Sequence, residues 1–140
     1  MQILIVEDNP TNCQLMERFL SACGRCRVVN DGQAGVEVFR LALDAGAPFG
    51  LVCLDVMMPK MDGHQVLSAL RALEQERGIP DEKRSCILMT TAVDSPASMQ
   101  DAKGGGSDGY LVKPIRKHDL YEELERHGLL PSGVLENPGL

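Results

Sequence analysis

Four ionisable side chains directly follow short apolar runs of the chain. Glu7 and Asp8 come after one run, Asp55 after another and Lys113 after a third. If these runs are strands of one parallel sheet, their carboxyl ends meet at a single edge, where such sheets bind ligands. Any one acid in such a position more often only caps a helix, but three acids that converge are harder to explain in that way.

Three neighbouring carboxylates cannot all stay ionised unless a cation offsets their repulsion. Hard oxygen ligands with room for water favour Mg²⁺. Asp55 is then a candidate nucleophile, Lys113 adds positive charge, and Thr90 or Thr91, after a fourth apolar run, adds a hydroxyl. A metal, a carboxylate nucleophile, a hydroxyl donor and a cation are the components of phosphoryl transfer to an aspartate.

The elements that must position these side chains are five strands alternating with helices. The apolar runs predict strands at residues 3–6, 26–29, 51–54, 86–89 and 110–112, and the segments between and after them predict helices at about 10–22, 32–45, 63–77, 95–103 and 116–127. Consecutive parallel strands need helical crossovers, so this order predicts an α/β fold with a parallel sheet.

Three further segments carry no such pattern. Residues 81–85 are charged and are expected to form a mobile connection, and the three glycines at 104–106 are expected to form a flexible joint. Residues 128–140, rich in proline and glycine, are expected to form a flexible C-terminal tail. The sequence thus predicts one domain over residues 1–127 with no output domain after it, either a single-domain protein or part of a longer one.

The composition excludes several classes of function. The formal net charge is −6, and an acidic surface repels nucleic-acid phosphates, so direct nucleic-acid binding is not expected. No apolar stretch approaches the roughly 20 residues of a membrane span, and no signal peptide is evident. Five scattered cysteines favour reduced thiols in the cytoplasm. Cys23 and Cys26 form a C-x-x-C pair, for which packing as small hydrophobic residues is favoured over a redox or metal role.

Four motifs in this order and spacing resemble the response-regulator receiver domain of two-component signalling, the family of the chemotaxis regulator. They are Glu7-Asp8-Asn9, the segment from Asp55 to Gly63 (DVMMPKMDG), Thr91-Ala92 and Lys113-Pro114. The resemblance covers residues 1–127. It implies a doubly wound, flavodoxin-like sheet of five parallel strands in the order 2-1-3-4-5 with five helices.

The resemblance also implies roles for the residues at the sheet edge. Asp55 would accept the phosphoryl group from the phosphohistidine of a histidine kinase or histidine phosphotransfer protein. Asp8, Asp55 and the backbone carbonyl of Met57 would hold Mg²⁺, with Glu7 in the outer sphere. Lys113 would pair with a phosphoryl oxygen, and its bond to Pro114 is expected to be cis.

Two further residues match the switch of this family. Thr91 rather than Thr90 would respond to the phosphoryl group, because it precedes the small residue Ala92, and Thr90 would be the last strand residue. Tyr110 would turn inward when Thr91 moves. The fourth helix, fifth strand and fifth helix would form the output surface and a possible homodimer contact. The protein would be a signalling switch, and its only catalysis would be its own phosphorylation and slow dephosphorylation.

Three other functions are compatible with parts of this pattern. A haloacid-dehalogenase-like phosphatase needs a second Asp two residues after the nucleophile, and residue 57 is Met. A flavodoxin-like electron carrier binds the flavin phosphate where Glu7 and Asp8 would repel it. A degenerate receiver that binds partners without phosphorylation remains as the alternative, although no key position is missing.

Overall fold

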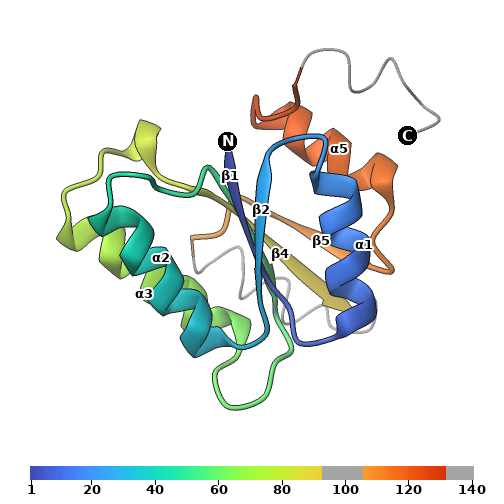
Figure 1. Cartoon of the computed structure of the whole chain (residues 1–140), viewed down its shortest axis with the longest axis horizontal. Coiled ribbons are helices and arrows are strands. Elements are labelled where there is room, and N and C mark those ends of the chain that lie inside the picture. The colour runs from blue at the N-terminus through green and yellow to red at the C-terminus, as the bar shows by residue number, and fades with distance from the viewer. Residues whose placement is uncertain (93–105, 132–140) are drawn as a thin grey trace.

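The computed structural model describes residues 1–92 and 106–131, and the predicted helix at 95–103, the glycines at 104 and 105 and residues 132–140 lie outside these ranges. The described strands are β1 (Gln2–Val6), β2 (Arg25–Val29), β3 (Leu51–Asp55), β4 (Cys86–Ala92) and β5 (Gly109–Lys113). The described helices are α1 (Pro10–Leu20), α2 (Gly32–Asp44), α3 (Gly63–Glu76), the short 3₁₀ helix η1 (Asp81–Lys83) and α5 (Lys117–Arg126). Their order along the chain is the predicted alternation (Figure 1).

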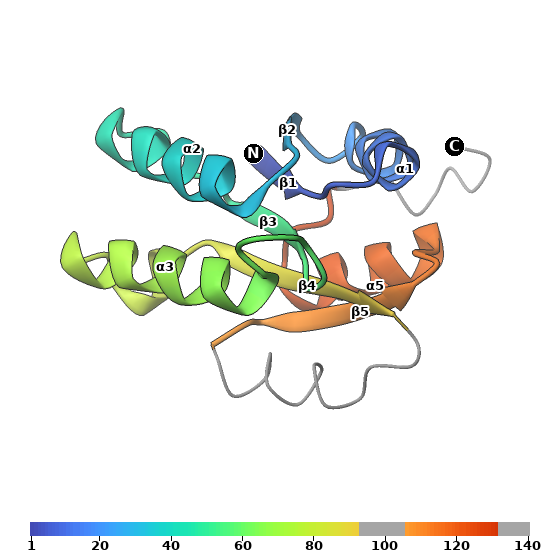
Figure 2. The same cartoon turned by 90° about the horizontal axis from the view of Figure 1, so that it is seen from below.

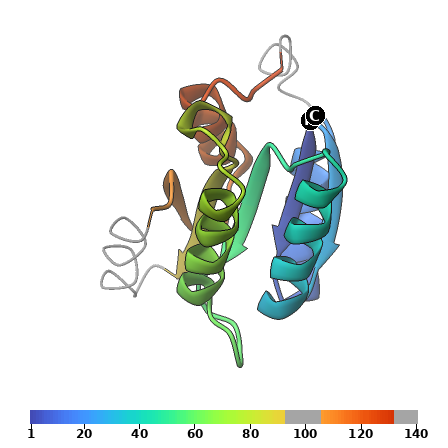
Figure 3. The ribbon, with the colours of Figure 1, turned by 90° about the vertical axis from the view of Figure 1, so that its left-hand side faces the viewer.

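The five strands form one parallel sheet in the order β2-β1-β3-β4-β5, which confirms the predicted topology. Helices α2 and α3 lie on one face and α1 and α5 on the other (Figure 2). Figure 3 shows α2 and α3 side by side along the sheet. The strand that follows each crossover runs in the same direction as the last, so the carboxyl ends of all five strands share one edge.

Side chains alternate along the strands between the two faces of the sheet, and each face carries its own hydrophobic core. Leu4, Val6 and Leu54 belong to the buried cluster under α2 and α3, whereas Ile3 and Ile5 belong to the cluster under α1 and α5. All five residues of β3 are buried, as expected for a central strand covered on both faces. The central strand therefore holds its last residue, Asp55, in a fixed and dehydrated position.

Polar side chains start the helices at the same edge of the sheet. The Asn9 side chain accepts a hydrogen bond from the backbone N–H of Asn12 at 3.0 Å, and Pro10 occupies the first turn of α1. Asp62 and Gln65 form a reciprocal capping box at the start of α3. These caps fix where the loops after β1 and β3 end, and thus where the acidic residues in them lie.

The structure corrects the predicted end of β4. The strand was expected to end near residue 89, with Thr90 as its last residue, but it runs through Ala92 and contains both threonines. It continues because both neighbours keep pairing with it: Thr90 pairs with Asp55 and Ala92 pairs with Lys113. Smaller differences of one or two residues occur at the ends of β2, α1 and β5.

Residues 81–85, for which a mobile connection is expected, contain local structure. Asp81–Lys83 form a turn of 3₁₀ helix, and Ser85 is buried. The backbone N–H of Ser85 donates to a carboxylate oxygen of Glu74 at 2.7 Å, and its hydroxyl donates to the carbonyl of Phe49. These long-range hydrogen bonds, which the local charge pattern does not show, hold the segment against α3 and β3.

Among the residues that the structure describes, none of the helices is long and apolar enough to cross a membrane.

Gly63 allows α3 to begin directly against the end of β3. A Cβ atom at this position would lie 2.4 Å from the carbonyl oxygen of Asp55 and 2.7 Å from the Cα of Val56. Both are backbone atoms, so neither can rotate away. The N–H of Gly63 donates to the carbonyl of Val56 at 3.0 Å, which requires this close approach.

We predict that Gly63→Ala lowers the free energy of unfolding by about 2–3 kcal/mol, because helix and strand must separate. Urea denaturation measures this loss. Ser68→Ala is the control, since Ser68 is exposed on the same helix and its replacement should change stability by less than about 0.5 kcal/mol. An equal effect of the two substitutions would contradict the proposed contact.

Candidate functional site

The carboxyl edge of the sheet brings Asp55, Glu7 and Lys113 together. Asp55 ends β3, Lys113 ends β5, and Glu7 directly follows β1. Although β4 separates β3 from β5, the long side chain of Lys113 reaches across it, and Nζ lies 3.0 Å from Oδ1 of Asp55. The same Nζ lies 3.1 Å from Oε1 of Glu7, so one ammonium group joins three strands.

Backbone N–H groups hold both carboxylates in place. Oδ1 of Asp55 accepts from the N–H of Met57 at 3.1 Å, and Oε2 of Glu7 accepts from the N–H of Asn9 at 3.1 Å. Asp55 is only 2% exposed and Glu7 only 4%. Asp8 is exposed, and one of its oxygens lies within 4.8 Å of oxygens of both other acids. The arrangement is a buried pair of acids with a third at its opening.

Burial and neighbouring charges change the proton affinity of this group. The pKa of Asp55 is raised from 3.8 to about 7: burial is the largest cause, the nearby Glu7 adds to the rise, and Lys113 opposes it. Burial acts to lower the pKa of Lys113, but its contacts with Asp55 and Glu7 outweigh this and raise it overall. Lys113 therefore stays charged, and the carboxylates have more negative charge than it can offset.

This donor set fits a hard divalent cation. Glu7, Asp8 and Asp55 supply only oxygen ligands, and among the described residues Lys113 is the one cation that forms ion pairs with them. Mg²⁺ prefers one or two carboxylates and retains several waters, for which the exposure of Asp8 leaves an approach from solvent.

The predicted switch residues lie on one face of the sheet. Tyr110 pairs with Met89, and both pack in the core under α2 and α3. Thr91 follows Met89 by two residues, so its side chain points to that same face. Thr91 is 1% exposed, and its Oγ1 is buried without a hydrogen-bond partner in the described part of the chain. A buried hydroxyl without an acceptor is unusual and is compatible with a group that binds a ligand.

The bond between Lys113 and Pro114 is cis, as expected from the resemblance.

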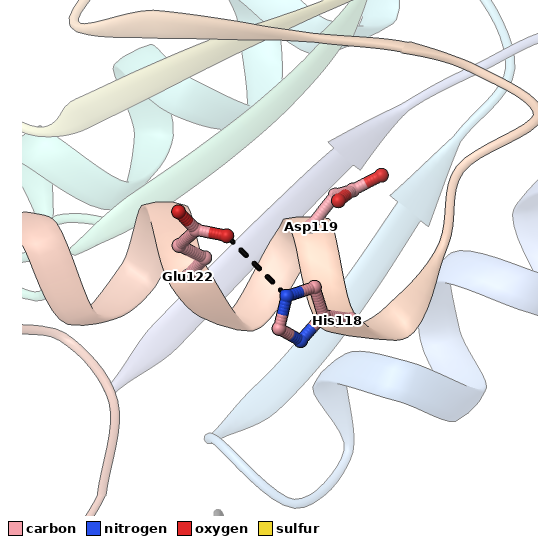
Figure 4. Close-up of side chains that lie close together, drawn as sticks. All are labelled: His118, Asp119 and Glu122. Atoms are coloured by element: carbon pink, nitrogen blue, oxygen red, sulfur yellow. Dashed lines mark ion pairs between the residues drawn. The ribbon is translucent and has the colours of Figure 1, made fainter.

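A second group of potential metal ligands lies on α5 and is fully exposed. Figure 4 shows His118, Asp119 and Glu122, with Nε2 of His118 3.5 Å from Oε2 of Glu122. The side chains of His118 and Glu122 are 84% and 57% exposed, and Arg126 also contacts Glu122. Exposed ion pairs of this kind are common on helices, so this group does not compete with the buried one.

The cysteines offer no reactive site. All five are free, and burial raises the pKa of the Cys23 thiol and raises that of Cys26 to about 11. A raised pKa leaves little thiolate at neutral pH, which disfavours redox chemistry at the C-x-x-C pair.

Two residues that sequence analysis missed support Glu7 from behind. The thiol of Cys13 and the side-chain amide of Asn30 each donate to the backbone carbonyl of Glu7 at 3.2 Å. Asn30 directly follows β2, and this position at the carboxyl end of a strand is the feature of the sequence that indicates a place near the site. Its contact with Glu7, 23 residues away, was not readable from the sequence.

Comparison with known proteins identifies the family of the chain. The family model described as the response regulator receiver domain matches residues 3–125. The chain belongs to this family. Receiver domains take part in two-component signal transduction, and the structural relatives with chemotaxis-type folds agree with the sheet described above.

Individual relatives of this receiver domain differ widely in length. The probable methanogenesis regulatory protein FilR2 of Methanothrix harundinacea is 34% identical over 127 residues, which cover 88% of this chain and 78% of that protein. The sensor histidine kinase GacS of Pseudomonas protegens is 35% identical over 121 residues, which cover 85% of this chain but only 12% of the kinase.

One solved relative holds a bound metal ion. The receiver domain of the sensor histidine kinase PA1611 from Pseudomonas aeruginosa is 28% identical with a TM-score of 0.72, and the match covers 89% of this chain and 94% of that one. That structure is described as having a magnesium ion coordinated in its active-site cleft.

The raised pKa of Asp55 predicts how stability depends on pH without metal. The folded chain holds this proton up to about pH 7, whereas the unfolded chain releases it near pH 4. Between these values the unfolded state binds fewer protons, so the free energy of unfolding falls as the pH rises and levels off above about pH 7. Asp55→Asn removes this loss and should be more stable than the wild type at pH 8 by on the order of 2 kcal/mol.

Urea denaturation in EDTA from pH 4 to pH 8 measures the difference, which should shrink toward pH 4. Glu125→Gln, at an exposed acid on α5, is the control and should follow the wild type. If Asp55→Asn also follows the wild type at every pH, the carboxylate of Asp55 is not strained by burial.

Proposed function

We propose that this receiver domain accepts a phosphoryl group on Asp55 from a phosphohistidine, in a reaction that needs Mg²⁺. The observation that carries the proposal is the position of Asp55: a buried carboxylate at the end of the central strand, 3.0 Å from Lys113 and grouped with Glu7 and Asp8. Membership of the receiver family supports the same reaction.

The proposed step is a displacement at phosphorus. An oxygen of Asp55 forms the new bond to phosphorus while the bond to the donor nitrogen breaks and its electron pair leaves with the histidine. Lys113 lies where it can neutralise charge on a phosphoryl oxygen. The buried hydroxyl of Thr91 can donate to a second oxygen. In this scheme Lys113 and Thr91 stabilise charge, and neither forms a bond to phosphorus.

Asp8, Asp55 and the backbone carbonyl of Met57 would hold Mg²⁺, with Glu7 in the outer sphere. The ion, when bound, neutralises phosphoryl charge. Asp55 ionises more readily beside a cation, because the positive charge opposes the rise in its pKa that burial causes.

The response to phosphorylation would pass from Thr91 to Tyr110. Both side chains lie on the face of the sheet that α2 and α3 cover, two residue pairs apart along β4 and β5. If Thr91 moves toward the phosphoryl group, space opens on that face for Tyr110 to turn inward. The surface of β5 and α5 would then change for a partner or a second copy of the chain.

The upstream partner would be a histidine kinase or histidine phosphotransfer protein. The likeness to a segment of GacS, a sensor histidine kinase, supports this class. Such kinases take their phosphoryl group from ATP, so the proposal puts the reaction in the cytoplasm. The domain would be modified in each cycle and would not turn over a substrate as an enzyme does.

We predict that incubation with Mg²⁺ and acetyl phosphate adds one phosphate to the wild type. Intact-protein mass spectrometry detects the added mass, which should be absent with Asp55→Asn and in EDTA. Asp119→Asn, at an exposed acid of the α5 cluster, is the matched control and should be phosphorylated like the wild type.

A wild type that stays unmodified by acetyl phosphate and by a phosphorylated histidine phosphotransfer protein would contradict the proposal. It would favour the alternative of a binding module that acts without phosphorylation.

A further inference from the structure

A partly buried ion network ties α3 to the beginning of β5, at the end of the sheet opposite the acidic site. Arg71 on α3 has a side chain that is 11% exposed. Its guanidinium lies 2.7 Å from Glu74 and 2.7 Å from Asp108, and it donates to the carbonyls of Ser85 at 2.9 Å and Gly106 at 3.1 Å. One side chain thus contacts α3, the start of β4 and the segment before β5.

Asp108 in turn forms two hydrogen bonds with the backbone of β4. Its own N–H donates to the carbonyl of Ile87 at 2.8 Å, and its Oδ2 accepts from the N–H of Ile87 at 2.8 Å. The first residue pair of the two strands, Leu88 with Gly109, follows directly. Asp108 therefore sets the point at which β5 starts to pair, and Arg71 holds the carboxylate that does so.

The register of β5 decides where Lys113 lies. Among the described strands, β5 lies at the edge of the sheet, has five residues and pairs with β4 alone. A slip by one residue would move the end of the strand by about 3.3 Å and turn each side chain to the other face. Lys113 would then leave Asp55 and Glu7, which it contacts at 3.0 and 3.1 Å.

The geometry is most specific at the buried pair of Arg71 and Glu74, whereas the side chain of Asp108 is 30% exposed. Glu74 is 1% exposed, with one oxygen on Arg71 and the other accepting from the N–H of Ser85. A guanidinium can satisfy several acceptors in fixed directions, whereas an ammonium is a single point charge. Lysine at position 71 would keep the charge beside Glu74 but could not hold Asp108 and both carbonyls at once.

We propose that Arg71 is a positioning residue for phosphoryl transfer: through Asp108 it fixes the register of β5 on β4 and thereby places Lys113 beside Asp55. This inference rests on the proposed function for its effect on the reaction, but its structural half does not. Asp55 ends β3, and Glu7 and Asp8 directly follow β1; these two strands pair with each other, and the three acids make no bond to Arg71 among the described contacts.

The test compares Arg71→Lys with the wild type for Mg²⁺ affinity and for the rate of phosphorylation by acetyl phosphate, at a temperature where both are fully folded. The rate of phosphorylation should fall by about tenfold or more, because misplacement of Lys113 by an ångström is costly. The affinity for Mg²⁺ should change less than about threefold, because the register of β5 does not move the acids. Arg77→Lys is the control, because Arg77 pairs with Asp44 at the exposed end of α3.

A double-mutant cycle with Lys113→Met shows whether Arg71 acts through Lys113. If it does, Arg71→Lys slows the wild type but has no further effect on Lys113→Met. An equal slowing in both backgrounds, or a parallel loss of Mg²⁺ affinity, would overturn the inference in favour of a general structural role.

Hydrogen exchange separates this inference from the proposed function, because it needs no phosphoryl donor. The amides of β5 should exchange at least about tenfold faster in Arg71→Lys, with those of β1 and β3 unchanged. Unchanged β5 amides would refute the inference even if phosphorylation occurs. Faster exchange in Arg71→Lys, together with a wild type that is never phosphorylated, would leave the register role standing and refute the proposed function.

Discussion

The shared ion pair of Lys113 with Asp55 and Glu7 is the interaction on which the site depends. Two buried carboxylates lie against one ammonium group, and a third acid lies at the opening. Burial makes Asp55 costly to ionise, and Lys113 offsets only part of that cost. The site is therefore short of positive charge, which favours the binding of a cation and explains why an apparently unfavourable cluster can belong to a stable fold.

The fold supplies this arrangement because all strands are parallel. The ends of β1, β3 and β5 reach one edge, so residues more than 100 positions apart meet without any dedicated loop. Gly63 and the capping box of Asp62 let α3 begin immediately after the loop that follows Asp55. At the opposite end, Arg71 and Asp108 fix where β5 begins. The position of β5 is thus fixed at its start by Arg71 and Asp108 and at its end by the ion pairs of Lys113.

Much of this was predictable from the sequence, for identifiable reasons. Apolar runs predicted the strands, and the acids after them predicted the site, because the period and the strand ends are local properties; the strand order followed from the family resemblance. The end of β4 was not predictable: Thr91 and Ala92 lie beyond the apolar run, but pairing with β3 and β5 extends the strand through them. Ser85 and Arg71 resemble surface residues and are buried only through partners far along the chain. The support of Glu7 by Asn30 depends on tertiary contacts in the same way.

Thermal unfolding with and without Mg²⁺ tests whether the acidic site is short of positive charge. A cation that binds only the folded chain raises the midpoint of unfolding. The account predicts a rise for the wild type, a loss of that rise with Asp8→Asn, and an unchanged rise with Glu122→Gln, which removes a ligand from the exposed cluster on α5. A wild type that does not respond to Mg²⁺, or an Asp8→Asn variant that responds as the wild type does, would contradict it.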